Sequence, residues 1–180
     1  SLTATVSVTQ SGKITITGGR DDFNTVNKSN SYATYTTTAG WEGCNCLVVG
    51  GGNTNSNPTF NSLLGADENT RAFVINGKTS TVGTITSPIL SGGCGKLSLN
   101  YGLPYKDTNI KFRIDILQND VKVFSTIIEN LNTIQFVKYT WSDDVNVSGD
   151  FQIVITNLCP SNDSTSNKDR VAIWDIIWTN

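Results

Sequence analysis

The sequence predicts an all-β protein, an antiparallel β-sandwich in which two sheets enclose one core. Many short segments alternate polar and apolar residues with a period of two, as strands with one buried face do. Turn-forming pairs such as Asn76-Gly77 and Gly92-Gly93 separate these segments. No segment carries a sustained helical period. Short alternating strands divided by such turns are typical of antiparallel sandwiches.

The expected strands follow one another along the chain. Residues 3–9 and 13–17 both alternate around Ser11-Gly12, which predicts a hairpin. The same alternation returns in later segments, namely 72–75, 96–101, 110–116, 151–155 and 171–179. Two polar stretches, 50–58 and 159–167, interrupt the pattern and are expected to be exposed loops.

Composition narrows the classes of function. A chain of 180 residues fits one domain with a substantial core. The formal charge of -2, with scattered lysines and arginines, argues against nucleic acid or an anionic membrane as a partner. The chain has 0 histidines, which excludes Ser-His-Asp and Cys-His nucleophiles and histidine bases. Abundant Thr, Ser, Asn and Gly with few charges are common in secreted all-β proteins. No signal peptide or long apolar run is visible, so we expect a mature fragment or a module of a longer chain.

Four cysteines form an even set, which suits an oxidising compartment. A bridge between Cys44 and Cys46 would close a strained ring, so the favoured pairs are Cys46 with Cys94 and Cys44 with Cys159. The alternative is four inert buried thiols. Zinc is disfavoured because one residue, Asn45, separates the first two cysteines, where zinc ligands usually have two or more between them.

An acid interrupts the apolar closing strand. Asp175 lies between Trp174 and Ile176, and a carboxylate buried there must be paired, hydrogen-bonded or bound to a metal. One hypothesis is a calcium ion that ties Asp175 to Asp21 or Asp22. The other is an exposed acid, or an ion pair with Arg170 or Arg20.

Two acidic pairs raise the question of glycosidase activity. Asp67-Glu68 and Asp143-Asp144 each place two acids side by side, whereas glycosidase carboxylates must face each other across a bond. Sequence neighbours on a strand point to opposite faces, so these pairs are poor candidates. A role for Asp67, Glu68 and Asp115 in a converging cleft is the weakest of the functional hypotheses.

Aromatic side chains can stack on sugar rings, while amides and charged groups bind the hydroxyls. The candidates for stacking are Trp41, Tyr101, Tyr105, Trp141 and Trp174. Trp141 and Trp178 are expected in the core, Trp41 is open between the two uses, and Tyr105 is the best exposed aromatic. In the segment 110–116 the isoleucines and Phe112 are expected to be buried. That places Lys111, Arg113 and Asp115 on the opposite face, which is a binding platform or a solvated face.

Three segments carry a resemblance to a known family. Residues 86–101, 147–153 and 171–179 resemble jelly-roll modules of secreted bacterial proteins. Such modules are appended to polysaccharide-degrading enzymes, extracellular nucleases and surface proteins, chiefly in gut and rumen bacteria. With Asp22-Phe23 and Gly40-Trp41, the resemblance runs over residues 20–180. Residues 1–19 lie outside it and are either an extra hairpin or the end of a preceding domain.

The resemblance implies a carbohydrate-binding module, some relatives of which hold structural calcium through an acid of the last strand. That role would fall on Asp175 and Asp22, although Trp174 stands where an acid is often found. We therefore expect a non-catalytic, monomeric module that binds a polysaccharide or oligosaccharide and is linked to a catalytic domain of a secreted enzyme. The expected polymer is a plant cell-wall β-glucan, xylan, mannan or pectin. The alternatives are a structural spacer or adhesive domain of a cell-surface protein, and a small glycosidase or lyase.

Overall fold

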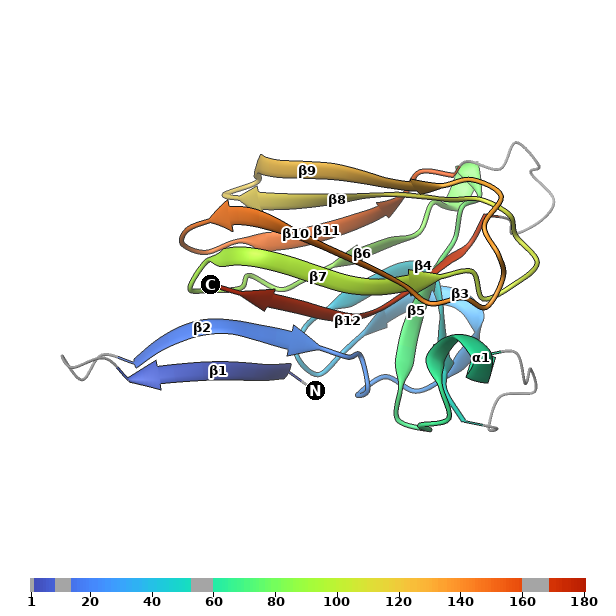
Figure 1. Cartoon of the computed structure of the whole chain (residues 1–180), viewed down its shortest axis with the longest axis horizontal. Helices are drawn as coiled ribbons and strands as arrows, with labels where there is room; N and C mark the ends of the chain where they lie inside the picture. The colour runs from blue at the N-terminus through green and yellow to red at the C-terminus, as the bar shows by residue number, and fades with distance from the viewer. Residues whose placement is uncertain (1, 9–13, 53–59, 160–168) are drawn as a thin grey trace.

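The computed structural model describes residues 2–8, 14–52, 60–159 and 169–180. The predicted all-β fold is confirmed, because the described residues form twelve antiparallel strands. The strands are β1 (Leu2–Val8), β2 (Ile14–Asp21), β3 (Ser29–Thr36), β4 (Glu42–Gly50), β5 (Arg71–Ile75), β6 (Thr84–Thr86), β7 (Cys94–Gly102), β8 (Ile110–Gln118), β9 (Val121–Asn130), β10 (Tyr139–Val147), β11 (Gln152–Asn157) and β12 (Val171–Thr179). A short helix α1 (Phe60–Leu64) and a 3-10 turn (Thr79–Thr81) complete the described elements (Figure 1). Most of the two predicted loops, 50–58 and 159–167, lies outside the described residues.

Strand β4 joins the two layers of the sandwich. Its first residues pair with β6, and residues 46–50 pair with β5. Between these parts Asn45 adopts a left-handed conformation, φ 50°, and its amide donates to the Val82 carbonyl at 3.1 Å. One layer then continues from β5 through β12 to β7 and β10, and the other from β6 through β11 to β8 and β9.

The main core lies between these layers. Its largest fully buried side chains include Trp41, Phe23, Phe73, Phe112 and Phe151. Trp178 is 4% exposed and packs with Trp41 at 6.0 Å between ring centroids, so its predicted place in the core is confirmed. A second, smaller cluster on the outer side of β4, β5 and β12 contains Trp174 and is covered by Leu63 and Leu64 of α1.

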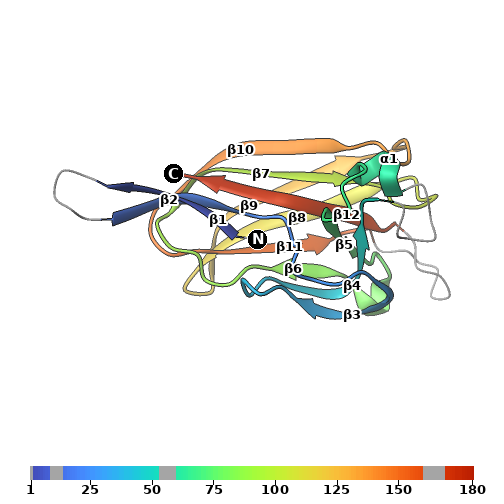
Figure 2. The same cartoon turned by 90° about the horizontal axis from the view of Figure 1, so that it is seen from below.

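Strands β1 and β2 pair antiparallel and extend beyond the rest of the sandwich at the end away from α1 (Figure 2). Only residues 18–21 of β2 pair with β12. The predicted boundary between residues 19 and 20 therefore falls inside a strand that belongs to the sheet. A Cβ atom at Gly19 would lie 2.5 Å from the Trp178 ring, so this close approach requires glycine. No helix among the described residues is long and apolar enough to cross a membrane.

The four cysteines are free thiols, so the predicted disulfides Cys46–Cys94 and Cys44–Cys159 are wrong. Cys46 of β4 lies opposite Ile75 of β5, and Cys94 of β7 lies opposite Val147 of β10, so neither cysteine faces another one in the strand pairing. Burial raises the pKa of both Cys46 and Cys94 to about 12. These two thiols are therefore protonated and unreactive at neutral pH.

Candidate functional site

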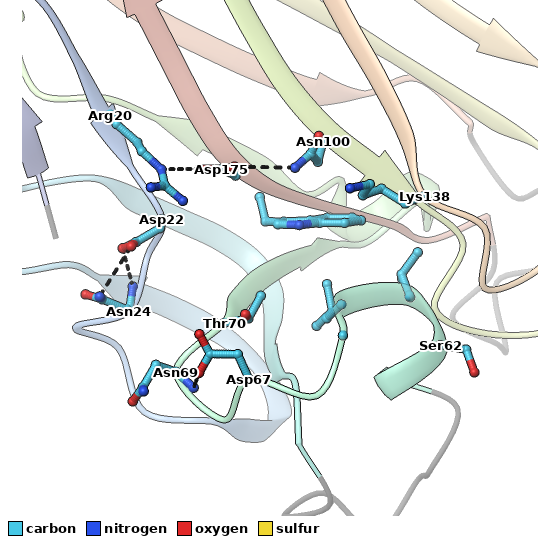
Figure 3. Close-up of a pocket in the computed structure, with 14 residues that line it drawn as sticks. Arg20, Asp22, Asn24, Ser62, Asp67, Asn69, Thr70, Asn100, Lys138 and Asp175 are labelled. Carbon is cyan, nitrogen blue, oxygen red and sulfur yellow. Dashed lines mark hydrogen bonds and ion pairs between the residues drawn. The ribbon is translucent and has the colours of Figure 1, made fainter.

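An open cleft of about 540 Å³ lies on the outer side of the layer that contains β7 and β12. Four parts of the chain form its walls (Figure 3): the end of β2 with the residues after it, the segment from α1 to β5, the outer faces of β7 and β12, and Lys138 directly before β10. The polar lining consists of Arg20, Asp22, Asn24, Ser62, Asp67, Asn69, Thr70, Asn100, Lys138 and Asp175. Trp174, Leu63 and Leu64 supply its apolar surface.

A β-bulge in β12 brings two adjacent side chains into this cleft. In a regular strand Trp174 and Asp175 would point to opposite faces. Asp175 instead has φ 55°, and the pairing with β7 shifts between Trp174 and Ile177. Asp175 and Ile176 of β12 there lie opposite the single residue Leu99 of β7, which is the geometry of a bulge. Trp174 and Asp175 consequently line the same cleft, while Ile173 and Ile176 remain in the core.

The Asp175 carboxylate is held on two sides. Arg20 donates to one carboxylate oxygen in an ion pair, and the Asn100 amide reaches the other at 3.5 Å. The Asn100 carbonyl in turn accepts from the Thr140 hydroxyl at 2.8 Å. Of the two sequence hypotheses for Asp175, the ion pair with Arg20 is the one that the structure contains.

The opposite wall is set by tight backbone packing. The backbone N–H of Asn69 donates to the Asp67 carboxylate at 2.9 Å, and the N–H of Thr70 donates to the Asp67 carbonyl at 3.1 Å. Gly51 lies directly behind this turn, where a Cβ atom would come within 2.3 Å of the Asp67 carbonyl oxygen. The turn therefore presents the Asp67 and Asn69 side chains to the cleft at a position fixed by β4.

The three predicted calcium ligands are each bound by groups of the protein itself. Asp21 is 2% exposed, and its carboxylate accepts the backbone N–H of Phe23 at 2.8 Å. The Asp22 carboxylate lines the cleft and accepts a hydrogen bond from the Asn24 side chain. The Asp175 carboxylate is ion-paired with Arg20. Across the described ranges, no three acidic or cysteine side chains come together as a metal site would require. The expected calcium ion stays a prediction of the sequence.

Three of the predicted sugar-stacking aromatics are buried, which corrects their assignment: Trp174 is 5% exposed, packs in the smaller cluster and only borders the cleft. Trp41 is 0% exposed and packs edge-on against Phe23 at 5.8 Å. Tyr101 is 6% exposed, stacks on Tyr139 at 5.5 Å and donates to the Asn130 side chain. Trp41 and Tyr101 therefore stabilise the core and have no free ring face for a ligand.

Tyr105 is half-buried, and a cation covers its ring. The Arg170 guanidinium lies 3.9 Å from the ring centroid, within cation–π range. Arg170 also donates to both carboxylate oxygens of Asp107, at 2.9 and 3.3 Å. This arrangement anchors the loop between β7 and β8 to the start of β12, so Tyr105 acts in packing.

The charged row of β8 lies on the outer face of the other layer, as the alternation predicted. Its charges are satisfied within the protein. Asp115 is bound by Arg113 at 2.7 Å, Lys122 at 3.0 Å and the Ser125 hydroxyl at 2.7 Å, and Lys111 pairs with Glu129 at 3.4 Å. Burial opposes the ionised form of Asp115, but these donors outweigh it and lower its pKa. The row is an internally paired face in which Asp115 is buried, and it lies apart from the cleft.

Among the cleft residues, sequence reasoning named Asp22 and Asp175 as candidate calcium ligands and Trp174 as a candidate stacking aromatic, and it placed Asp67 in an unlikely catalytic pair. It missed Arg20 as a wall residue, as well as Asn24, Asn69, Asn100 and Lys138. One signal was available, because Ile173 and Ile176 are three residues apart and both apolar. When two residues of one strand both face the core, an odd spacing between them indicates that an extra residue, a bulge, lies between them.

No family model matches the chain, and no curated protein sequence matches it. Solved structures are similar in fold. The K1 cleaved adhesin domain of Lys-gingipain from Porphyromonas gingivalis is 12% identical, with a TM-score of 0.51 over 91% of this chain and 99% of that domain. The module TmCBM61, solved with β-1,4-galactotriose, is 10% identical, with a TM-score of 0.47 over 78% of this chain and 88% of that one.

An exo-β-1,3-galactanase from Phanerochaete chrysosporium is 14% identical over 93% of this chain, with a TM-score of 0.45. This chain spans 31% of the length of that enzyme. The chain is a β-sandwich, and its fold resembles that of the K1 adhesin domain.

Proposed function

We propose that the chain is a non-catalytic carbohydrate-binding module of a secreted or cell-surface protein, and that the cleft beside Trp174 and Asp175 is its ligand site. The sugar would be part of a polysaccharide, and the module would hold a linked catalytic domain near that polymer. Such attachment raises the effective concentration of substrate and requires no chemistry in the module itself.

The observation that carries this proposal is the bulge at Asp175. A non-glycine residue in a left-handed conformation in the middle of a strand is costly, and such strain concentrates at binding sites. Here it turns the Asp175 carboxylate to the same side of the sheet as Trp174, whose ring is 5% exposed and only borders the cleft. Fixed carboxylate and amide groups of this kind can bind the hydroxyl groups of a sugar.

The cleft is better suited to binding than to hydrolysis. Asp175, one of its acids, is ion-paired with Arg20. The weakest sequence hypothesis placed Asp115 with Asp67 and Glu68, but Asp115 lies on the outer face of β8 and is paired there. These two facts support a non-catalytic role.

Affinity gel electrophoresis against soluble β-glucan, xylan, mannan and pectin tests the proposal. We expect one class to retard the protein. Replacing Asn69 or Asn100 with alanine should weaken binding by about three- to tenfold, because each loss removes one hydrogen-bonding group. The matched control is Lys111→Ala, on the other layer, which should bind as the wild type does. Equal loss in the control would contradict the cleft assignment.

A second candidate is an adhesive domain of a surface protein. The observation that favours it is on β9, where Val121, Val123 and Ile127 are 63%, 46% and 53% exposed. Apolar side chains exposed along one strand can mark a protein-binding surface. Unchanged mobility against the whole glycan panel would shift the assignment to this function.

A further inference from the structure

We infer that β9 is the interface of a symmetric dimer, in which the β9 strands of two copies of this chain pair antiparallel about a two-fold axis at Ile127. Such pairing would join the layer that ends in β9 with the same layer of the second copy. The inference goes beyond the proposed function, because it does not depend on what the cleft binds. It replaces the monomer expected from the sequence.

Strand β9 is an edge strand that offers its backbone to another strand. It pairs with β8, and no other described strand lies beside it in the sheet. The N–H of Leu158 donates to the Lys111 carbonyl at 2.8 Å, so the backbone groups of Lys111 point toward β11. Glu129 lies opposite Lys111 and therefore directs its N–H and C=O away from β8. The register from Phe124 to Asn130 is regular, so Ile127 and Ser125 do the same.

The exposed apolar side chains of this edge match a two-fold axis. Val123 and Ile127 of β9 and Leu131, directly after it, are all exposed and stand four residues apart. Antiparallel pairing centred on Ile127 places this residue opposite its own copy and brings Val123 close to Leu131 of the second copy. A second copy of the chain therefore covers the whole row, as a self-complementary interface requires.

The polar residues of β9 agree with the same register. Ser125 would lie opposite Glu129 of the second copy, so no like charges face each other across the new pair. Glu129 keeps its own counter-charge, because Lys111 lies 3.4 Å from its carboxylate. The irregular part of β9, where Lys122 reaches Asp115 at 3.0 Å, lies before the regular segment that would pair. The edge charges therefore do not oppose association.

The dimer would leave both clefts accessible. No residue of β9 lines the cleft, which lies on the other layer. With the proposed function, one dimer would present two clefts to one polymer. Binding at the first cleft would then raise the effective concentration of glycan at the second.

The test measures the association of the full chain by sedimentation velocity over a series of protein concentrations. We expect the wild type to dimerise and Ile127→Lys to raise the dissociation constant of the dimer by about tenfold or more, because two lysines would face each other at the axis. Ile127→Glu should have the same effect. A mixture of Ile127→Lys and Ile127→Glu should dimerise again, since opposite charges then meet at the axis.

The matched control is Thr36→Lys, which adds the same charge at an exposed position of β3, a strand that pairs with β4. It should dimerise as the wild type does. A wild type that stays monomeric at every concentration would overturn the inference and leave the proposed function standing. Dimerisation of Ile127→Lys alone at the wild-type concentration, or failure of the mixture to dimerise, would overturn the pairing at Ile127. Circular dichroism of each variant confirms that loss of the dimer is not loss of the fold.

Discussion

Asp175 combines two roles that a pair of substitutions can separate. Its backbone forms the bulge at φ 55°, and its carboxylate pairs with Arg20 and contacts Asn100. Aspartate tolerates the left-handed region better than most residues, and glycine adopts it without penalty, whereas alanine does not. Because the Arg20 side chain is 46% exposed, solvent screens the ion pair, and the pair itself adds little to stability.

We expect Asp175→Ala to be less stable than Asp175→Gly by about 1 kcal/mol, because only alanine pays for the backbone conformation. Both variants should lose glycan binding, since both lack the carboxylate. Urea denaturation measures the first effect, and affinity electrophoresis measures the second. Equal stability of the two variants would show that the bulge is not maintained in solution.

Asp115 should make the free energy of unfolding depend on pH in the acidic range. Burial raises the pKa of Asp115, but the donors Ser125, Arg113 and Lys122 lower that pKa by a larger amount, so the net shift is downward. Its contribution is therefore complete above the unfolded-state pKa of about 3.9 and is lost as pH falls through the folded-state value. The free energy of unfolding of the wild type should fall more steeply below about pH 4 than that of Asp115→Asn. Parallel curves for the two proteins would contradict this role.

At the scale of the element, β12 explains why some features were predictable and others were not. Its alternation predicted a core strand with Trp178 inside, which is confirmed, because burial of large apolar side chains dominates strand register. The sequence did not predict that β12 contributes buried side chains on both of its faces. Val171 and Ile173 face the main core, Ala172 and Trp174 face the smaller cluster, and one extra residue then resets the alternation before Ile176. A prediction that assumes a strict period of two cannot include such an extra residue.

Deleting Asp175 should leave the fold intact. Without it, Trp174 and Ile176 become neighbours and the strand alternates regularly against β7, because the deletion removes the residue that shifts the register. We expect a cooperative thermal transition and native near-UV dichroism, with glycan binding abolished.

The matched control is deletion of Ile177 in the same strand. That change would turn Trp178, which is 4% exposed, from the core to the outer face and should prevent folding. If both deletions unfold the protein, the bulge is part of the folding register and not an insertion into a regular strand.

At the scale of the whole molecule, the composition and alternation were sufficient for the architecture but insufficient for the site. The sandwich follows from many strands that each bury one face. The cleft depends on contacts between residues far apart in sequence, such as Arg20 with Asp175 and Gly51 with Asp67, which no local pattern encodes. The predicted disulfides failed for a related reason, since the even number of cysteines says nothing about which strands are neighbours.

The hairpin tests how far the module extends. A protein that lacks residues 1–8 keeps the pairing of residues 18–21 with β12, whereas one that lacks residues 1–21 loses it and uncovers Trp178. Exposing a large apolar side chain costs about 1.5–3 kcal/mol, so the longer truncation should lower Tm substantially and the shorter one only slightly. Thermal unfolding followed by circular dichroism measures both. Equal Tm values for the two truncated proteins would support the predicted boundary after residue 19.

The central claim is that the cleft beside Trp174 and Asp175 binds a glycan, and amide chemical-shift mapping during titration with cellohexaose, xylohexaose and mannohexaose tests it most directly. The account predicts that one of these neutral oligosaccharides shifts the backbone amides of Asp22, Asn69, Asn100 and Asp175 together, while those of Arg113 and Ile127 stay in place. Shifts confined to the β8 and β9 face, with an unchanged cleft, would contradict it.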